Sequence, residues 1–92
     1  MIEIRYTPEF VKRYNKLSVS VQKKAEQKEK IFRANPFHPS LNTEKLKPKE
    51  KEYWSLRIDL DYRIIFRFLT NNKIVFVTCG HHNWIYKFII TH

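Results

Sequence analysis

Three segments of alternating apolar and polar residues, separated by two short turn sequences, constrain the fold of this chain more than any other feature. They run from 53 to 79, with Asp59-Leu60-Asp61 and Asn71-Asn72 between them. Alternation with a period of two is typical of β-strands that bury one face, and Asn tolerates the positive φ of tight hairpin turns. The sequence therefore predicts three consecutive antiparallel strands.

The lengths of the two turns set the register of these strands. A three-residue loop pairs Arg57 with Arg63, and a two-residue turn sets Phe68 against Val75. One face is then the predicted core, with Trp54, Leu56, Ile58, Tyr62, Ile64, Phe66, Phe68, Val75, Val77 and Cys79. The other face carries Tyr53, Ser55, Arg57, Arg63, Ile65, Arg67, Ile74, Phe76 and Thr78.

Two arginines that face each other across a strand pair repel, at a cost of roughly 0.2–1 kcal/mol, so an anion is expected beside Arg57 and Arg63. A phosphodiester fits, because guanidinium groups bind phosphate oxygens through two parallel hydrogen bonds. The alternative is that Asp59, Asp61 or Glu52 pairs with these arginines.

Length and charge narrow the class of protein. The 92 residues suffice for one domain, expected over 1–92, with one modest core. A formal charge of +9 predicts a polyanionic partner, either nucleic acid or an acidic protein. The single cysteine excludes an internal disulfide and suits a reducing cytosol, and no apolar run approaches membrane-spanning length. We expect a cytoplasmic protein with no membrane partner.

The first half of the chain predicts one strand and two helices. Residues 2–6 alternate, and Thr7-Pro8-Glu9 combines a hydroxyl cap, a proline and an acid that favour a helix start. A second helix begins after Ser18 or Ser20 and runs to about Ala34. The predicted fold is α+β: an N-terminal strand, two helices packed on a three- to four-stranded antiparallel sheet, and a short C-terminal segment.

The segment 36–52 is the only long irregular one, and such loops in small domains are often functional. Leu41 and Leu46 should anchor it to the core. Its lysines, which are Lys45, Lys47, Lys49 and Lys51, should then lie exposed beside the sheet.

Two histidines follow the third strand. The apolar positions at 84, 85, 88 and 89 fit a short amphipathic helix, with a terminal strand as the alternative. Either arrangement places His82 and Tyr86 near the arginine pair. Adjacent histidines also suggest a metal, but only His38 and His92 could join them and no carboxylate has a suitable spacing. We therefore expect neither a metal nor another cofactor.

These side chains provide the parts that RNA cleavage needs. Histidine titrates near neutrality and can transfer a proton to or from the reacting groups. Arginines that point at the phosphate stabilise the charge that develops in the transition state. Tyrosine or tryptophan can stack on an unpaired base.

The chain resembles the RelE/ParE superfamily of bacterial and archaeal toxins. The matching segments are Lys45-Leu46, Tyr53 to Ile58, Asp61 to Phe66, and Gly80 to Lys87, the last similar to the G-x-H-[DN]-x-[IV]-Y-[RK] ending of RelE-like members. The resemblance implies the fold given above. It also implies a toxin that cuts messenger RNA in the ribosomal A site without metal, through 2′-hydroxyl attack, and that an antitoxin silences.

The resemblance also implies roles for single residues. Arg57 and Arg63 look like the basic strand residues that hold the scissile phosphate, His82 like a residue of proton transfer, and Tyr86 like a tyrosine that stacks on or orients the substrate. The remaining expected RNA contacts are Lys45, Lys47, Lys49, Arg67, His81 and Trp84. Because the family pattern has lysine and arginine where this chain has His81 and His82, the general base and the general acid are not assigned singly.

The leading hypothesis is thus a ribosome-dependent endoribonuclease toxin, monomeric when free, with the ribosome, mRNA and an acidic antitoxin as partners. One alternative is a ParE-like toxin that binds DNA gyrase and cleaves no RNA; another is an inactive protein that binds RNA or an antitoxin. We expect the positive charge of the chain to attract the acidic antitoxin. We also expect the antitoxin to cover an apolar patch of Ile65, Ile74 and Phe76.

Overall fold

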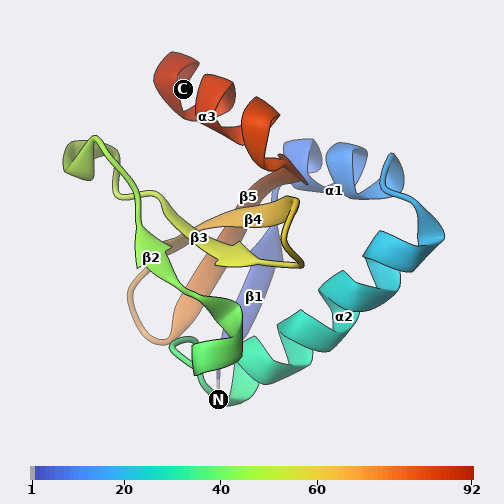
Figure 1. Ribbon diagram of the computed structural model, residues 1–92. Coiled ribbons are helices and arrows are strands. Elements are labelled where there is room, and N and C mark those ends of the chain that lie inside the picture. Colours follow the sequence, from blue (N-terminus) through green and yellow to red (C-terminus); the bar gives the residue numbers. More distant parts are fainter. Residues whose placement is uncertain (1) are drawn as a thin grey trace.

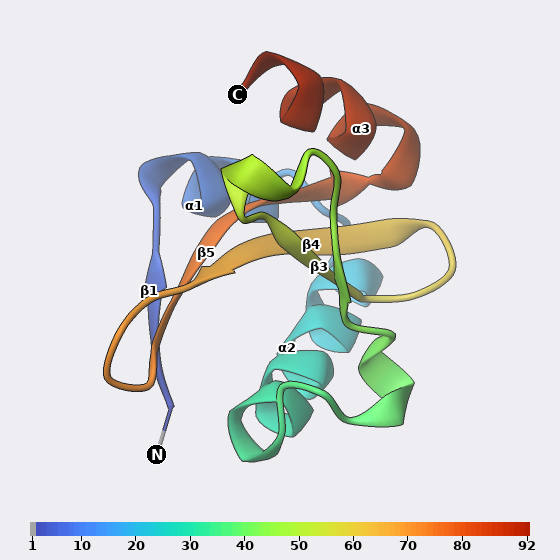
Figure 2. The same cartoon turned by 90° about the vertical axis from the view of Figure 1, so that its left-hand side faces the viewer.

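A computed structural model describes residues 2–92 as helices on both faces of one sheet (Figures 1 and 2). The elements are β1 (Glu3–Tyr6), α1 (Pro8–Asn15), α2 (Val19–Ala34), the 3-10 turn η1 (Pro39–Leu41), β2 (Glu44–Lys45), the 3-10 turn η2 (Lys49–Lys51), β3 (Trp54–Arg57), β4 (Tyr62–Phe68), β5 (Lys73–His81) and α3 (His82–Thr91). The α+β prediction is confirmed, and the C-terminal segment is a helix.

The sheet that residues 2–92 form has five strands in the order β1-β5-β4-β3-β2. β1 runs parallel to β5, and all other neighbours are antiparallel. The sheet contains two strands besides the three central ones that the alternation predicts. The N-terminal strand joins the sheet beside β5, and Glu44–Lys45 adds a short edge strand from the 36–52 segment. The sheet is therefore larger than the predicted three to four strands.

The first two helices begin where the sequence predicts. The Thr7 hydroxyl accepts a hydrogen bond from the N–H of Phe10 at 2.9 Å, and Pro8 occupies the first turn. Ser18, rather than Ser20, caps α2 by accepting from the N–H of Val21 at 3.2 Å. Each cap satisfies a backbone donor that the first helical turn leaves without a partner.

α2 and α3 lie on opposite sides of the sheet (Figure 2), and apolar side chains form one core on each side. The larger core, beneath α1 and α2, consists of Ile4, Phe10, Val21, Ala25, Phe32, Leu41, Leu56, Ile58, Ile64, Phe66, Ile74, Phe76 and Cys79. The smaller core, beneath α3, consists of Leu46, Tyr53, Ile65, Ile85, Phe88 and Ile89. Leu41 and Leu46 thus anchor the 36–52 segment as predicted, one in each core.

The predicted register is right for one hairpin and wrong for part of the next. β3 and β4 pair as predicted, with Arg57 opposite Arg63. In the β4–β5 hairpin, however, Phe68 lies opposite Ile74 instead of Val75, and a bulge between Ile65 and Phe66 restores the predicted register farther along. A one-residue shift exchanges the two faces of a strand.

That shift overturns one expectation about the surface. Ile74 and Phe76 belong to the larger core and are 2% and 0% exposed, while α3 covers Ile65, which is 0% exposed. The prediction that these three residues form an exposed apolar patch for the antitoxin is therefore wrong. Burial raises the pKa of the Cys79 thiol to about 12, as expected for a core cysteine.

None of the helices within residues 2–92 has the length and apolar character that a bilayer-spanning helix requires.

Candidate active site

Arg57 and Arg63 face each other on the side of the sheet that α3 partly covers. The Nη1 group of Arg63 donates to the carbonyl oxygens of Asp59, Leu60 and Tyr62 at 2.8, 3.1 and 3.0 Å. Within residues 2–92, no carboxylate forms an ion pair with either arginine. The β3–β4 loop therefore fixes the Arg63 side chain without neutralising it, so the predicted alternative of a carboxylate partner is wrong.

Asp59, one of the predicted partners, shapes the loop instead. Its Oδ1 accepts from the N–H groups of Asp61 and Tyr62 at 2.8 and 2.9 Å, and its Oδ2 pairs with Lys24 at 3.3 Å. Burial opposes ionisation of this carboxyl, but these hydrogen bonds and Lys24 outweigh it and hold the pKa of Asp59 below its ordinary value.

The two histidines lie where β5 ends and α3 begins. His81 caps the helix, since its Nδ1 accepts from the N–H of Asn83 at 3.2 Å. The N–H of His82 donates to the carbonyl oxygen of Asp61 at 2.8 Å. The two imidazoles stack with ring centroids 4.5 Å apart. Because Arg63 and His82 both bond to carbonyls of the β3–β4 loop, that loop holds them at one end of the sheet.

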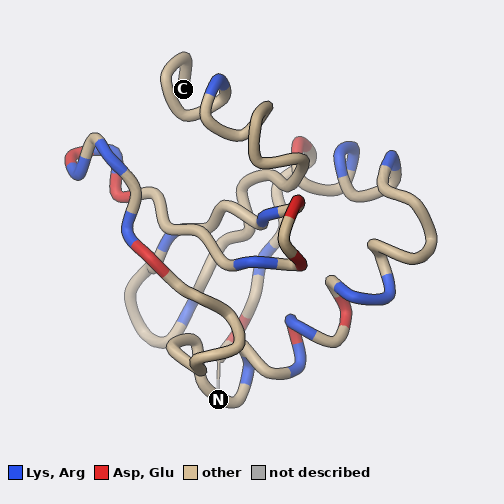
Figure 3. The backbone as a smooth tube through the Cα atoms, in the orientation of Figure 1, with Lys and Arg blue, Asp and Glu red and all other residues tan. Residues whose placement is uncertain are grey.

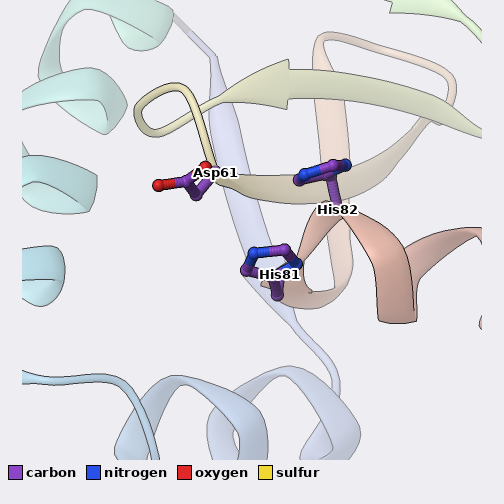
Figure 4. Close-up of side chains that lie close together, drawn as sticks. All are labelled: Asp61, His81 and His82. Atoms are coloured by element: carbon purple, nitrogen blue, oxygen red, sulfur yellow. The ribbon is translucent and has the colours of Figure 1, made fainter.

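Asp61 joins the histidine pair, which spacing in the sequence did not indicate (Figure 4). Ligand-type atoms of Asp61, His81 and His82 all lie within 4.8 Å of one another. The pairing of Tyr62 with His81 causes this, because it brings the preceding residue beside the start of α3. A carboxylate is thus present where none was expected.

Tyr86 lies one helical turn beyond His82 and is 56% exposed. It lines a groove of ≈ 410 Å³ together with Lys45 and Lys47, which are exposed as the sequence predicts. Figure 3 shows Lys and Arg positions along β2 and the segment after it, and on both strands beside the β3–β4 loop. Glu44 lines the groove as well, so basic side chains outnumber acidic ones there by two to one.

Three other expected RNA contacts, Lys49, Arg67 and Trp84, do not line this groove. Lys49 lines a shallow hollow with Lys47, Pro48 and Glu50. The guanidinium of Arg67 lies 5.6 Å from the ring centre of Tyr53.

Trp84 lies on the opposite side of α3 from Tyr86. The guanidinium of Arg13 stacks over its ring at 4.1 Å, and Trp84 packs against the smaller core. Two residues along a helix correspond to about 200° of rotation, so Trp84 and Tyr86 cannot share a face. The structure does not bring Trp84 to the groove, and its expected role in RNA binding stays a prediction.

A small basic chain with this five-stranded sheet between its helices has the fold of RelE-like toxins. The family described as "RelE-like toxin of type II toxin-antitoxin system HigB" matches residues 9–82. The chain belongs to this HigB-like toxin family.

Solved structures share the fold at low sequence identity. The YoeB/ParE toxin from Agrobacterium tumefaciens superposes with a TM-score of 0.74 at 20% identity, covering 88% of this chain and 99% of that one. YafQ from E. coli strain BL21(DE3) gives 0.71 at 19% identity, covering 94% and 99%. The RelB-RelE antitoxin-toxin complex from Methanococcus jannaschii gives 0.72 at 21% identity, covering 91% and 96%. A comparison with curated protein sequences finds no match.

Proposed function

We propose that this toxin is an endoribonuclease that cleaves messenger RNA on the ribosome through attack of a 2′-hydroxyl on the adjacent phosphate. The observation that carries the proposal is the convergence of Arg63 and His82 on the carbonyl groups of one loop. The loop thus holds the His82 backbone and the Arg63 guanidinium at the same end of the sheet, and an imidazole with a guanidinium pair suits acid–base chemistry at a phosphodiester. A protein that only binds a partner has no need of it there.

In the proposed reaction a base removes the 2′-hydroxyl proton, and the oxygen attacks phosphorus. The bond to the 5′-oxygen then breaks, and an acid returns a proton to that leaving oxygen, so that a 2′,3′-cyclic phosphate remains. His82 performs one of these two proton transfers. Arg57 and Arg63 stabilise the charge on the phosphorane, which a preorganised cation does without rearrangement during the reaction.

The groove beside Tyr86 would hold the neighbouring nucleotides. Lys45 and Lys47 are exposed there and can contact the RNA backbone. The Tyr86 ring is the exposed aromatic surface next to them, and a base can stack on such a ring whatever its identity.

An acidic antitoxin is the proposed regulatory partner. A formal charge of +9 on 92 residues favours association with an acidic protein, and the antitoxin-toxin complex from M. jannaschii shares this fold. The ribosome and its message are the proposed polyanionic targets.

A primer-extension assay on a defined message in a reconstituted translation reaction tests the proposal. Wild type should cut only when ribosomes are present. His82→Ala should lower the cleavage rate by about 10²–10⁴-fold and Arg63→Ala by about 10²–10³-fold. Arg5→Ala is the matched control, because Arg5 is exposed on β1 and pairs only with Glu3.

Circular dichroism should show that all variants are folded. An intact message together with growth arrest in expressing cells would overturn the nuclease and favour a gyrase-type or other binding toxin. Cleavage that survives in His82→Ala would overturn the assignment of the site.

A further inference from the structure

We propose that Asp61, His81 and His82 form a binding site for a first-row transition-metal ion such as Zn²⁺, and that metal bound there withdraws His82 from the reaction. The metal site goes beyond the proposed function. Only its inhibitory effect rests on that function.

Geometry supports the site directly. The candidate ligand atoms of the three residues lie within 4.8 Å of one another (Figure 4). A tetrahedral zinc ion with bonds of about 2.0–2.2 Å separates its ligand atoms by about 3.3–3.6 Å, so the ligand atoms need to approach one another by at most about 1.5 Å. Asp61 is exposed and both histidines are only half-buried, so rotation of their side chains can provide this movement.

The backbone around the three residues is already fixed, which lowers the entropy that binding must remove. Tyr62 pairs with His81 across β4 and β5, and the N–H of His82 bonds to the Asp61 carbonyl oxygen at 2.8 Å. The ligands therefore come from one rigid junction of strand, loop and helix.

The donor set selects the kind of ion. Two imidazoles and one carboxylate suit zinc, copper, nickel or iron, whereas calcium and magnesium prefer oxygen ligands alone. Three ligands leave a coordination position for water. The Asp61 carboxylate is particularly important, because the positive end of the α3 dipole and the Arg63 guanidinium both oppose a cation at this place.

Metal binding must compete with the cap of α3. His81 Nδ1 accepts the Asn83 N–H, so a neutral His81 ring carries its proton on Nε2. A metal on Nδ1 takes the lone pair that accepts the Asn83 N–H. A metal on Nε2 leaves the proton of the neutral ring on Nδ1, which then cannot accept, so either mode of ligation breaks the cap bond. Binding should shift the Asn83 amide resonance, a signal that a weakly attached surface ion would not produce.

The geometry of the site also explains how a bound metal ion would inhibit the proposed RNA cleavage. A metal-bound His82 nitrogen has no lone pair left to accept a proton, and the other ring nitrogen of the neutral imidazole already carries one. The ring can then neither act as a base nor become the imidazolium that would act as the acid. Asp61 contributes its side chain to the metal but to no step of the proposed cleavage reaction. Its replacement should therefore separate metal binding from catalysis.

Calorimetric titration of the untagged full chain with ZnCl₂ tests the site without any need for activity. We expect one equivalent to bind to wild type. Replacing a ligand, in Asp61→Asn or His81→Gln, should weaken binding by at least the ~10–100-fold that loss of even a supporting residue causes. The matched control is the double variant His38→Gln, His92→Gln, which removes both histidines outside the site and should bind as wild type does.

Equal binding by wild type and Asp61→Asn, loss of binding in the His38/His92 double variant, or no binding by wild type would each overturn the metal site. The ribosome assay then tests inhibition separately: Zn²⁺ should slow wild type and leave Asp61→Asn unaffected. If both proteins cleave equally with and without Zn²⁺ although calorimetry shows binding, the inhibitory role is wrong and the site stands. If neither cleaves, the proposed function and the inhibitory role fail together, and calorimetry alone decides the site.

Discussion

The backbone N–H of His82 donates to the carbonyl oxygen of Asp61 at 2.8 Å, and this bond ties the first residue of α3 to the β3–β4 loop. Arg63 donates to the carbonyl oxygens of the other three residues between 59 and 62. All four consecutive carbonyls of the loop thus accept from one of the two residues proposed for the chemistry. The loop sets the position of both groups at once.

Replacing Arg63 by Lys should impair the protein although the charge remains. The planar guanidinium binds three carbonyls through Nη1 and keeps its other nitrogens for a phosphate, whereas an ammonium group cannot do both. We expect cleavage to fall by about 10²-fold and the free energy of unfolding to fall by about 1 kcal/mol. Primer extension and urea unfolding measure the two effects. Arg5→Lys, on exposed β1, should change neither.

Acid should weaken the fold partly through Asp59. Its pKa is lower in the folded chain than in the unfolded chain, so its contribution is complete above the unfolded pKa and is lost as pH falls through the folded pKa. Asp59→Asn keeps an oxygen acceptor for the N–H groups of Asp61 and Tyr62 but has no charge to titrate. Urea unfolding across acidic pH should therefore show a smaller loss of stability in the variant than in wild type. Parallel pH profiles for the two proteins would contradict this assignment.

The strand pairing of a hairpin could be predicted from the sequence where the apolar–polar alternation and the length of the turn give the same register. At Asp59-Leu60-Asp61, loop length and alternation agree, and the Arg57–Arg63 pair is as predicted. In the β4–β5 hairpin the same reasoning predicts the wrong register next to the turn. Asn71 and Asn72 both adopt positive φ as predicted, yet the strands shift by one residue beside them and a bulge reverses the shift. No glycine lies at that bulge, so nothing in the alternating pattern of the sequence indicated where it would occur.

The site was predictable to a similar extent. His82 and Tyr86 follow from position along the chain, but the approach of Asp61 to the histidines depends on pairing between β4 and β5. The predicted register already implied it, because extending the Ile64–Cys79 pair by two residues sets Tyr62 opposite His81. Spacing along the sequence alone could not show a contact made across a sheet.

Replacing Gly80 by Ala should strain the start of α3. An added Cβ would lie 2.9 Å from Cε3 and 3.3 Å from Cζ3 of the Trp84 ring, so the ring must move. We expect a loss of about 1–3 kcal/mol in the free energy of unfolding and a change in tryptophan fluorescence. In a Trp84→Phe background the smaller ring leaves room, so the penalty should shrink there. An equal penalty in both backgrounds would exclude this contact as its cause.

Lys51 connects the 36–52 segment to the end of α3. Its Nζ donates to the carbonyl oxygens of Ile89 and Ile90 at 2.6 and 3.4 Å, where the helix leaves carbonyls without partners. Lys51→Met should cost about 1 kcal/mol of stability and speed amide exchange in the last turn of α3. Lys49→Met is the control, since Lys49 is exposed in the same 3-10 turn. Similar exchange in the two variants would show that Lys51 does not secure the helix end.

Two variants of Tyr86 distinguish stacking of its ring on a base from a chemical role of its hydroxyl group. The ring is 56% exposed in the groove with Lys45 and Lys47, and within the described chain its hydroxyl has no hydrogen-bond partner to hold it in place. If the ring stacks on a base, Tyr86→Phe should cleave nearly as fast as wild type, whereas Tyr86→Ala should lose about 1–3 kcal/mol of binding, mainly as a raised KM. Trp84→Phe, on the other side of α3, should alter stability and leave KM unchanged. Initial cleavage rates at varied concentrations of programmed ribosomes measure KM and kcat. A large fall in kcat for Tyr86→Phe would mean instead that the hydroxyl acts in the reaction, which would make Tyr86 the partner of His82 in proton transfer.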